Sequence, residues 1–153
     1  MDSRVFSKKV INKGRGDAPT KGSLAFFLVK GYYFETKTVT HPSPKLDQKH
    51  GHLFFDADAM MARPMELPLG DHSTVQGLDA ALMTMKEGEE ASVTVPSQFG
   101  YPRGSPQGFH GMGKPIPPNC HLLFQVSVLK VWNKATVGRH KRMCSVLAQP
   151  SEQ

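Results

Sequence analysis

A short amphipathic helix that leads directly into a strand constrains this chain more than any other feature. Both elements are predicted within residues 69–96, LGDHSTVQGLDAALMTMKEGEEASVTVP. A helix of about three turns is not stable alone in water, so its apolar stripe must pack against another element. The stripe has helical spacing and is formed by Val75, Leu78, Ala81, Leu82 and Met85.

The ends of this helix and the strand after it carry their own signals. Ser73 is a suitable N-cap, and Gln76 three residues later completes a capping box. Gly88 is a suitable C-terminal stop. Apolar and polar residues then alternate over 91–95, as expected of a half-buried strand on which the helix can lie.

The rest of the chain reads as strands separated by turns that are rich in Gly and Pro. Gly31 interrupts one strand and predicts a bulge, and Pro68 breaks another. Several strands with a single helix favour an α+β fold, in which an antiparallel sheet of five or six strands wraps around the helix. The predicted strands cover residues 5–11, 24–34, 53–55, 64–69, 91–95 and 121–132.

Composition favours one globular domain. Hydrophobic residues make up 39% of the 153 residues and charged residues 21%, which fits a packed core and not wholesale disorder. The net charge of +6 comes from basic residues near both ends. We expect a folded domain over 1–132 and a flexible basic tail over 133–153. The basic ends lack a binding motif and interleaved aromatic residues, so they predict solvated charge and not a nucleic-acid site.

Several classes of site and location are disfavoured. Cys120 and Cys144 are too few for a disulfide scaffold, which favours free thiols in the cytoplasm or nucleus. The longest apolar run, residues 24–29, is too short to span a membrane. His50 and His52 share a strand face but have no third ligand at defined spacing, so we expect neither a metal nor a cofactor.

Six short motifs follow one another in the order of a known family. They are KVINKGRGDAP near the start, FDAD at 55–58, RPMELPLG at 63–70, VQGLDAALMTMKEGEEASVTVP at 75–96, FGY at 99–101 and PIPPNCHLLFQVSVLKV at 115–131. On these motifs, residues 5–132 resemble the FKBP-type peptidyl-prolyl cis/trans isomerases, the immunophilins that bind tacrolimus and rapamycin. The resemblance implies an antiparallel half-barrel of five or six strands around one short helix, in agreement with the pattern above.

The activity that the resemblance implies needs no acid–base pair. An X–Pro peptide bond isomerises over a barrier of about 20 kcal/mol and takes tens of seconds unaided. An apolar pocket that holds the prolyl ring and favours the twisted amide accelerates this step without moving a proton. The implied substrates are proline-containing peptides or client proteins.

Position by position, the resemblance places a pocket on named residues. Phe55 and Asp56 match the family's phenylalanine–aspartate pair, and Val75 matches the aliphatic residue whose backbone amide is a ligand donor. From the residues alone, Asp56 either orders the pocket or only caps a turn. Tyr101 matches the tyrosine whose hydroxyl bonds a substrate carbonyl, and Ile116 and Phe124 match the apolar walls; each of these three also fits a purely structural role in the core.

Three positions depart from the family's pattern. Val29 replaces a tyrosine of the second strand, Met65 replaces a phenylalanine before the helix, and Leu78 replaces the tryptophan of the pocket floor. Each change removes ring surface, and a buried aromatic side chain covers about 150–250 Å². We therefore expect a looser pocket, weaker tacrolimus binding and reduced isomerase activity.

Two loops are longer than is common in the family. The first loop lies just before Phe55 and covers residues 40–52, THPSPKLDQKHGH. The second borders the predicted pocket and covers residues 102–115, PRGSPQGFHGMGKP. Loops of this length are usually functional or disordered. Phe109 and Met112 are apolar residues of the second loop that either contact a partner or fold back over the cleft.

Two hypotheses about function follow from these residues. The first is a monomeric peptidyl-prolyl isomerase with a diverged pocket and reduced activity, which assists protein folding or acts as a co-chaperone. The second is a catalytically inactive protein–protein interaction module on the same fold. The first hypothesis is favoured by the retained Phe55, Asp56, Tyr101 and Ile116. The second is favoured by the changes at Val29, Met65 and Leu78.

Overall fold

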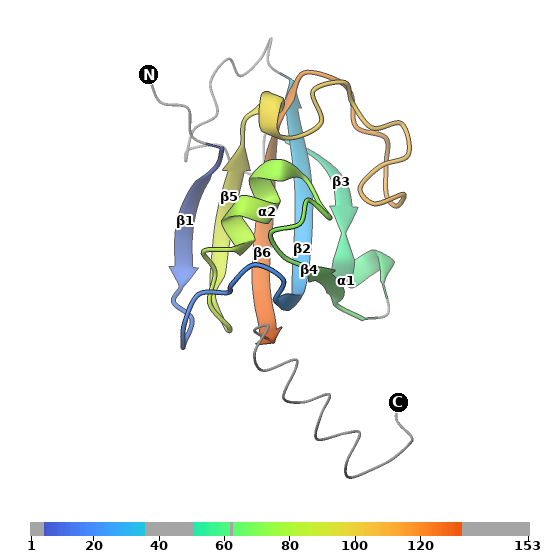
Figure 1. Cartoon of the computed structure of the whole chain (residues 1–153). Helices are drawn as coiled ribbons and strands as arrows, with labels where there is room; N and C mark the ends of the chain where they lie inside the picture. Colours follow the sequence, from blue (N-terminus) through green and yellow to red (C-terminus); the bar gives the residue numbers. More distant parts are fainter. Residues whose placement is uncertain (1–4, 36–50, 62, 133–153) are drawn as a thin grey trace.

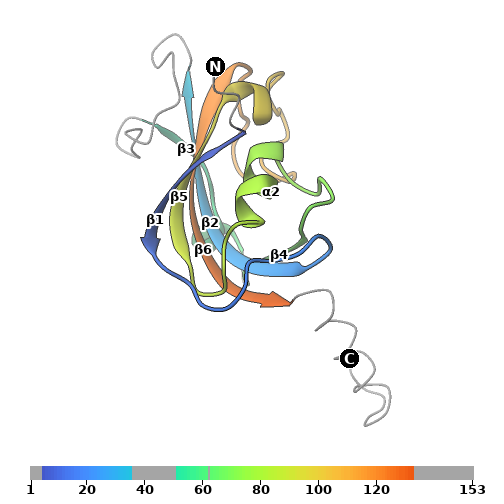
Figure 2. The same cartoon turned by 60° about the vertical axis from the view of Figure 1, so that its left-hand side comes forward.

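A curved antiparallel sheet with one helix in its concave face makes up the domain (Figures 1 and 2). The computed structural model describes residues 5–35, 51–61 and 63–132. The six strands have the order β1-β5-β6-β2-β3, and β4 pairs with β2 beyond the end of β3, which leaves the sheet open. This is the predicted α+β architecture. The strands are β1 (Ser7–Asn12), β2 (Leu24–Glu35), β3 (His52–Asp56), β4 (Met65–Pro68), β5 (Glu90–Val95) and β6 (Cys120–Trp132), and the helices are α1 (Ala57–Met60), α2 (Gln76–Leu82) and the 3₁₀ turn η1 (Ser97–Phe99).

The centre of the sheet is the long antiparallel pair of β2 and β6. The pair stays in register along nearly the whole of both strands, apart from one shift between Phe26 and Phe27. Phe124, Val126 and Val128 are buried on β6, while the residues between them are only half-buried. The predicted alternation holds from Phe124 to Val128, where one face of the sheet covers the core, but Cys120 to Phe124 are all buried.

An irregularity is present opposite Gly31, but the extra residue is Phe54 on β3, and β2 itself pairs regularly with β6 at Gly31. The register of β2 against β3 shifts between Gly31 and Tyr32. The ring of Phe54 lies over Gly31, where an added Cβ would collide with it. The irregular pairing leaves both Phe54 and its neighbour Phe55 fully buried, although successive residues of a regular strand point to opposite faces. The missing side chain at Gly31 thus makes room for a second aromatic ring.

The ends of α2 differ from the predicted ones. Val75 is the N-cap, and among the described residues no side chain caps the first turn. The predicted capping box is wrong, because the helix begins at Gln76 and Ser73 lies two residues before the N-cap. The hydroxyl and the backbone N–H of Ser73 both donate to Asp71 Oδ1, at 2.6 and 3.1 Å. The helix ends at Leu82 after about two turns, and Gly88 lies in the turn before β5, with φ 86°.

Asp79 holds α2 in place from a buried position. Its carboxylate accepts a hydrogen bond at 2.9 Å from the backbone N–H of Gly70, which follows β4. Asp79 is 5% exposed, so this bond connects the helix to the sheet from inside the core. The apolar stripe predicted for the helix also lies in the core: Val75, Leu78, Ala81, Leu82 and Met85 are all buried.

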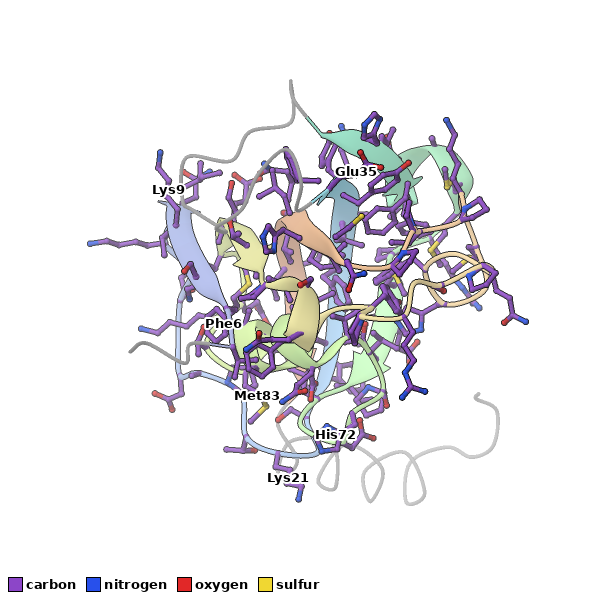
Figure 3. The ribbon with its side chains drawn as sticks, turned by 90° about the horizontal axis from the view of Figure 1, so that it is seen from above. Phe6, Lys9, Lys21, Glu35, His72 and Met83 are labelled. Carbon is purple, nitrogen blue, oxygen red and sulfur yellow. The ribbon has the colours of Figure 1, made fainter. Side chains whose placement is uncertain are left out.

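A buried ion pair connects the edge strand β1 to the turn before β5. Lys8 Nζ lies 2.6 Å from Glu89 Oε2, and the two side chains are 16% and 6% exposed. Lys8 also donates to the carbonyl of Thr84, and Glu89 Oε1 accepts the backbone N–H of Lys86. The next residue, Lys9, is exposed and lies at the outer side of β1 (Figure 3).

Two sequence predictions fall largely outside the described residues. The first long loop, 40–52, is described only from residue 51, and the tail over 133–153 is not described. The division into a domain and a tail therefore stays a prediction. Within residues 5–35, 51–61 and 63–132, no helix combines the length and the apolar character needed to cross a membrane.

Candidate functional site

The apolar residues predicted to form the pocket lie together in one cluster at the concave face of the sheet. They come from β2, β3, β4, the start of α2, the loop after η1, and β6. All are nearly or fully buried, with the following exposed fractions: Phe55, Leu78 and Phe124 0%, Val29 2%, Ile116 3%, Met65 4% and Val75 5%. The fold therefore brings these residues together, and it also covers them.

A ring from the second long loop lies against two of the predicted walls. Phe109 is 0% exposed, and its ring centroid lies 5.0 Å from that of Phe55 and 5.7 Å from that of Phe124. The ring centroid of Phe54 lies 6.1 Å from that of Phe109 and 5.9 Å from that of Phe124. These separations are typical of favourable aromatic pairs. Of the two roles considered for Phe109, folding back onto the pocket is the one that the structure has.

Phe54 is a member of this cluster that the sequence prediction missed. The family resemblance named Phe55 and Asp56 at this point of the chain and gave no role to Phe54. The glycine across the sheet was the available signal, because Phe54 is the extra residue of a bulge opposite Gly31, and a bulge changes the direction of side chains.

Asp56 caps a helix. Its Oδ1 accepts the backbone N–H groups of Asp58 at 3.0 Å and Ala59 at 3.4 Å, at the start of α1. This is the N-cap arrangement, and it fixes the chain directly after Phe55. The sequence left open whether Asp56 orders the pocket or caps a turn; the cap is present, and it adjoins the wall residue.

Tyr101 is half-buried, as is Asp56, whereas the apolar residues of the predicted pocket are buried. Burial raises the pKa of its hydroxyl to about 12, so the group is a neutral hydrogen-bond donor at physiological pH. Tyr101 and Val75 line a depression of about 440 Å³, together with His72 and His110. A peptide in this depression would meet the tyrosine hydroxyl at its edge.

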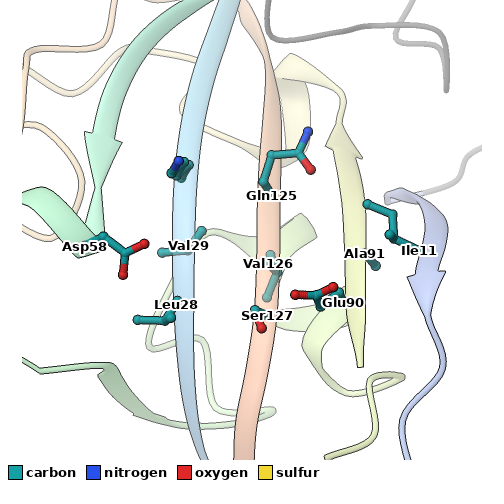
Figure 4. Close-up of a pocket in the computed structure, with 10 residues that line it drawn as sticks. Ile11, Leu28, Val29, Asp58, Glu90, Ala91, Gln125, Val126 and Ser127 are labelled. Atoms are coloured by element: carbon teal, nitrogen blue, oxygen red, sulfur yellow. The ribbon is translucent and has the colours of Figure 1, made fainter. Parts of the chain in front are cut away.

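A second depression lies on the face of the sheet that points away from α2 (Figure 4). It measures about 400 Å³ and crosses four strands, with Leu28, Gln125 and Ser127 among its lining residues. These residues alternate with the buried ones of β2 and β6, so they face outward. None of the aromatic residues of the predicted pocket lies here.

Other candidate groups do not assemble into a reactive centre in the described part of the chain. Cys120 is buried, and burial together with the charge of Glu35 raises the pKa of its thiol, which disfavours the reactive thiolate. Residues 5–35, 51–61 and 63–132 contain no group of three or more His, Cys, Asp or Glu side chains placed to hold a metal ion. His50 lies outside these residues, so the expectation of no metal stays a prediction.

Comparison with known proteins identifies the family. A model of the FKBP-type peptidyl-prolyl cis-trans isomerase family matches residues 19–129, which include every predicted site residue. The chain belongs to this family. The sequence resemblance is thereby confirmed, and so is the fold class that it implied.

The chain matches two FK506-binding proteins over segments of different length. The chain is 37% identical over 78 residues to an FK506-binding protein of Neisseria meningitidis, a match covering 51% of this chain and 66% of the relative. It is 27% identical over 125 residues to FK506-binding protein 1 of Aspergillus oryzae, covering 81% of this chain and 96% of the relative. The chain thus spans just under two thirds of the bacterial relative and nearly all of the fungal one.

Solved structures show the same fold. The N-terminal domain of FKBP42 from Arabidopsis thaliana matches with a TM-score of 0.64 and 27% identity, over 85% of this chain and 87% of that one. The three FKBP domains of wheat FKBP73 match with a TM-score of 0.66 and 22% identity, over 88% of this chain and 49% of that chain. The second likeness concerns the fold alone.

Proposed function

We propose that this FKBP-type domain is a peptidyl-prolyl cis/trans isomerase of reduced activity, which acts on proline-containing peptides or client proteins in the cytoplasm or nucleus. The observation that carries the proposal is the clustering of Phe55, Ile116 and Phe124 beside the half-buried Tyr101, which lines a depression at the surface. An apolar wall with one neutral donor at its edge suits a reaction in which an amide twists and no proton moves.

The reduced rate follows from the three departures from the family's pattern. Val29, Met65 and Leu78 supply no aromatic ring where the family has Tyr, Phe and Trp. A prolyl ring on this floor would lose dispersion contacts and would be held less firmly. Since binding energy that positions the substrate contributes to the rate, a looser floor lowers catalysis.

The test is exchange spectroscopy by NMR on a short X–Pro peptide, with and without the domain. We expect measurable acceleration of cis/trans exchange, inhibition by rapamycin, and a lower rate for Tyr101→Phe, which keeps the ring and removes the donor. No acceleration at high protein concentration, with the fold intact by its own NMR spectrum, would contradict an isomerase.

A second candidate function is a binding module without catalysis, for instance within a co-chaperone. It is favoured by the near-complete burial of the pocket walls. In the same experiment, this function predicts chemical-shift changes around Tyr101 on titration with the peptide, while the exchange rate of the peptide stays at its uncatalysed value.

A further inference from the structure

The loop after Tyr101 folds as a small hairpin, called the pocket loop below (residues 102–116; Figure 1). At its base, Ser105 and Ile116 exchange backbone hydrogen bonds of 2.7 and 2.9 Å. At its tip, Phe109 and Met112 exchange bonds of 2.8 and 2.9 Å. These two pairs of backbone hydrogen bonds give the loop a defined hairpin conformation, so the direction of each side chain is fixed.

This hairpin directs one ring inward. Phe109 is fully buried at the tip, while His110 and Gly111 beside it are exposed. The ring lies between the walls contributed by Phe55 and Phe124, at the centroid distances given above. These two walls belong to the site proposed for the substrate amide. Phe109 therefore occupies space that a prolyl substrate needs.

Few bonds hold the tip in this position. The backbone N–H of Lys114 donates to the carbonyl of Phe54 at 2.9 Å, beside Gly113, where an added Cβ would collide with the same carbonyl. His110 Nε2 lies 2.8 Å from Thr74 Oγ1, next to the start of α2. The second bond joins exposed side chains, so water replaces it readily when the tip moves away.

The backbone at the tip is suited to a hinged motion. Gly108, Gly111 and Gly113 all have φ between 77° and 83°, and His110 has φ 52°. This left-handed conformation is uncommon outside glycine, and histidine is one of the residue types that adopt it more often. Glycines on both sides of Phe109 let the chain change direction without moving the base of the hairpin.

We propose that Phe109 is a built-in occupant of the prolyl site, and that substrate or drug binds only after the pocket loop swings outward. This inference rests on the proposed function, because it assigns a regulator to the same pocket. A site that is open in only a fraction of molecules binds its ligand with an apparent Kd raised by the reciprocal of that fraction. Removal of the ring or loosening of the tip must then tighten binding.

The first experiment measures rapamycin affinity by calorimetry for the wild-type domain, Phe109→Ala and Thr74→Val. We expect a decrease in Kd of at least tenfold for Phe109→Ala and of a few fold for Thr74→Val, which removes the bond to His110 and leaves the pocket walls intact. Arg103→Ala, an exposed change in the same loop, is the matched control and should leave Kd unchanged. Folded variants that bind no tighter than the wild type would overturn the proposal.

A second experiment measures the reactivity of a thiol in the pocket wall, and it tests the role of Phe109 independently of the proposed isomerase function. Met65→Cys places a thiol in the pocket wall, in a background in which Cys120 and Cys144 are serine. We expect its reaction with a small maleimide to be at least tenfold faster when Phe109→Ala is added. If no variant binds rapamycin or catalyses exchange, the proposed function fails. In that case an accelerated thiol still supports the occupant role, and an unchanged thiol rate overturns it.

Discussion

Tyr101 is the residue whose ionisation reports most directly on the site. The pKa of a phenol in water is about 10, and burial raises the pKa of Tyr101 to about 12. The folded state therefore holds this proton more tightly than the unfolded state does. Its contribution to stability is complete below pH 10 and is lost as the pH rises from about 10 towards 12.

This shift can be measured by following phenolate absorbance during an alkaline titration. The chain has three tyrosines, and the difference between the wild type and Tyr101→Phe isolates one of them. We expect the difference curve to have its midpoint near pH 12. A midpoint near pH 10 would mean that the hydroxyl is solvated, and that it does not lie at a desolvated pocket edge.

At the scale of elements, the ion pair between Lys8 and Glu89 decides how firmly β1 is attached. Substitution of Lys8 by Met leaves the carboxylate of Glu89 in a largely buried place without its cation. The loss of a partner from a buried pair is costly, and the slight exposure of Lys8 reduces that cost to about 2–3 kcal/mol. Urea unfolding of Lys8→Met measures this loss.

Two further variants test the cause of the loss. Lys9→Met removes a charge from the neighbouring exposed position, and we expect it to change the unfolding free energy by no more than about 0.5 kcal/mol. Adding Glu89→Gln to Lys8→Met removes the stranded charge and keeps the acceptor for Lys86. We expect the double variant to recover part of the unfolding free energy lost in Lys8→Met. If its loss equals the sum of the losses in Lys8→Met and Glu89→Gln alone, the two charges do not interact.

The elements differ in how far the sequence predicts them. The strand around Phe124 was predictable because an alternating pattern follows directly from a sheet with one covered face. The cap of α2 was not predictable, since Ser73 is a good capping residue, yet the helix begins only at Gln76 and Ser73 lies before it in a turn with Asp71.

The candidate site was predictable in its residues and not in its access. Motif matches named Phe55, Ile116 and Phe124, and the fold places these residues in one cluster. The position of Phe109 depends on how a 15-residue hairpin closes against strands distant in the sequence, as the two bonds at its base and tip show. No local pattern in PRGSPQGFHGMGKP fixes that closure, so two roles for its apolar residues remained open.

At the scale of the whole molecule, the division into a domain over 1–132 and a tail over 133–153 is a prediction that unfolding experiments can test. We expect a fragment of residues 1–132 to unfold at the same urea concentration, and with the same slope, as the full chain. Equal slopes would mean that both proteins expose the same surface on unfolding. A clear drop in the midpoint would show that residues 133–153 stabilise the domain.

The place of β6 in the sheet has a consequence for how the chain reaches this state. β6 is the last strand of the described residues, yet it lies between β5 and β2. A ribosome therefore releases β1 to β5 before the strand that joins the two halves exists. Until then β2 and β5 each present an unpaired apolar edge, which is open to pairing with other chains. Since pairing of β2 with β6 also closes a long segment of chain, we expect folding to begin late during synthesis and to be slow for a domain of this size.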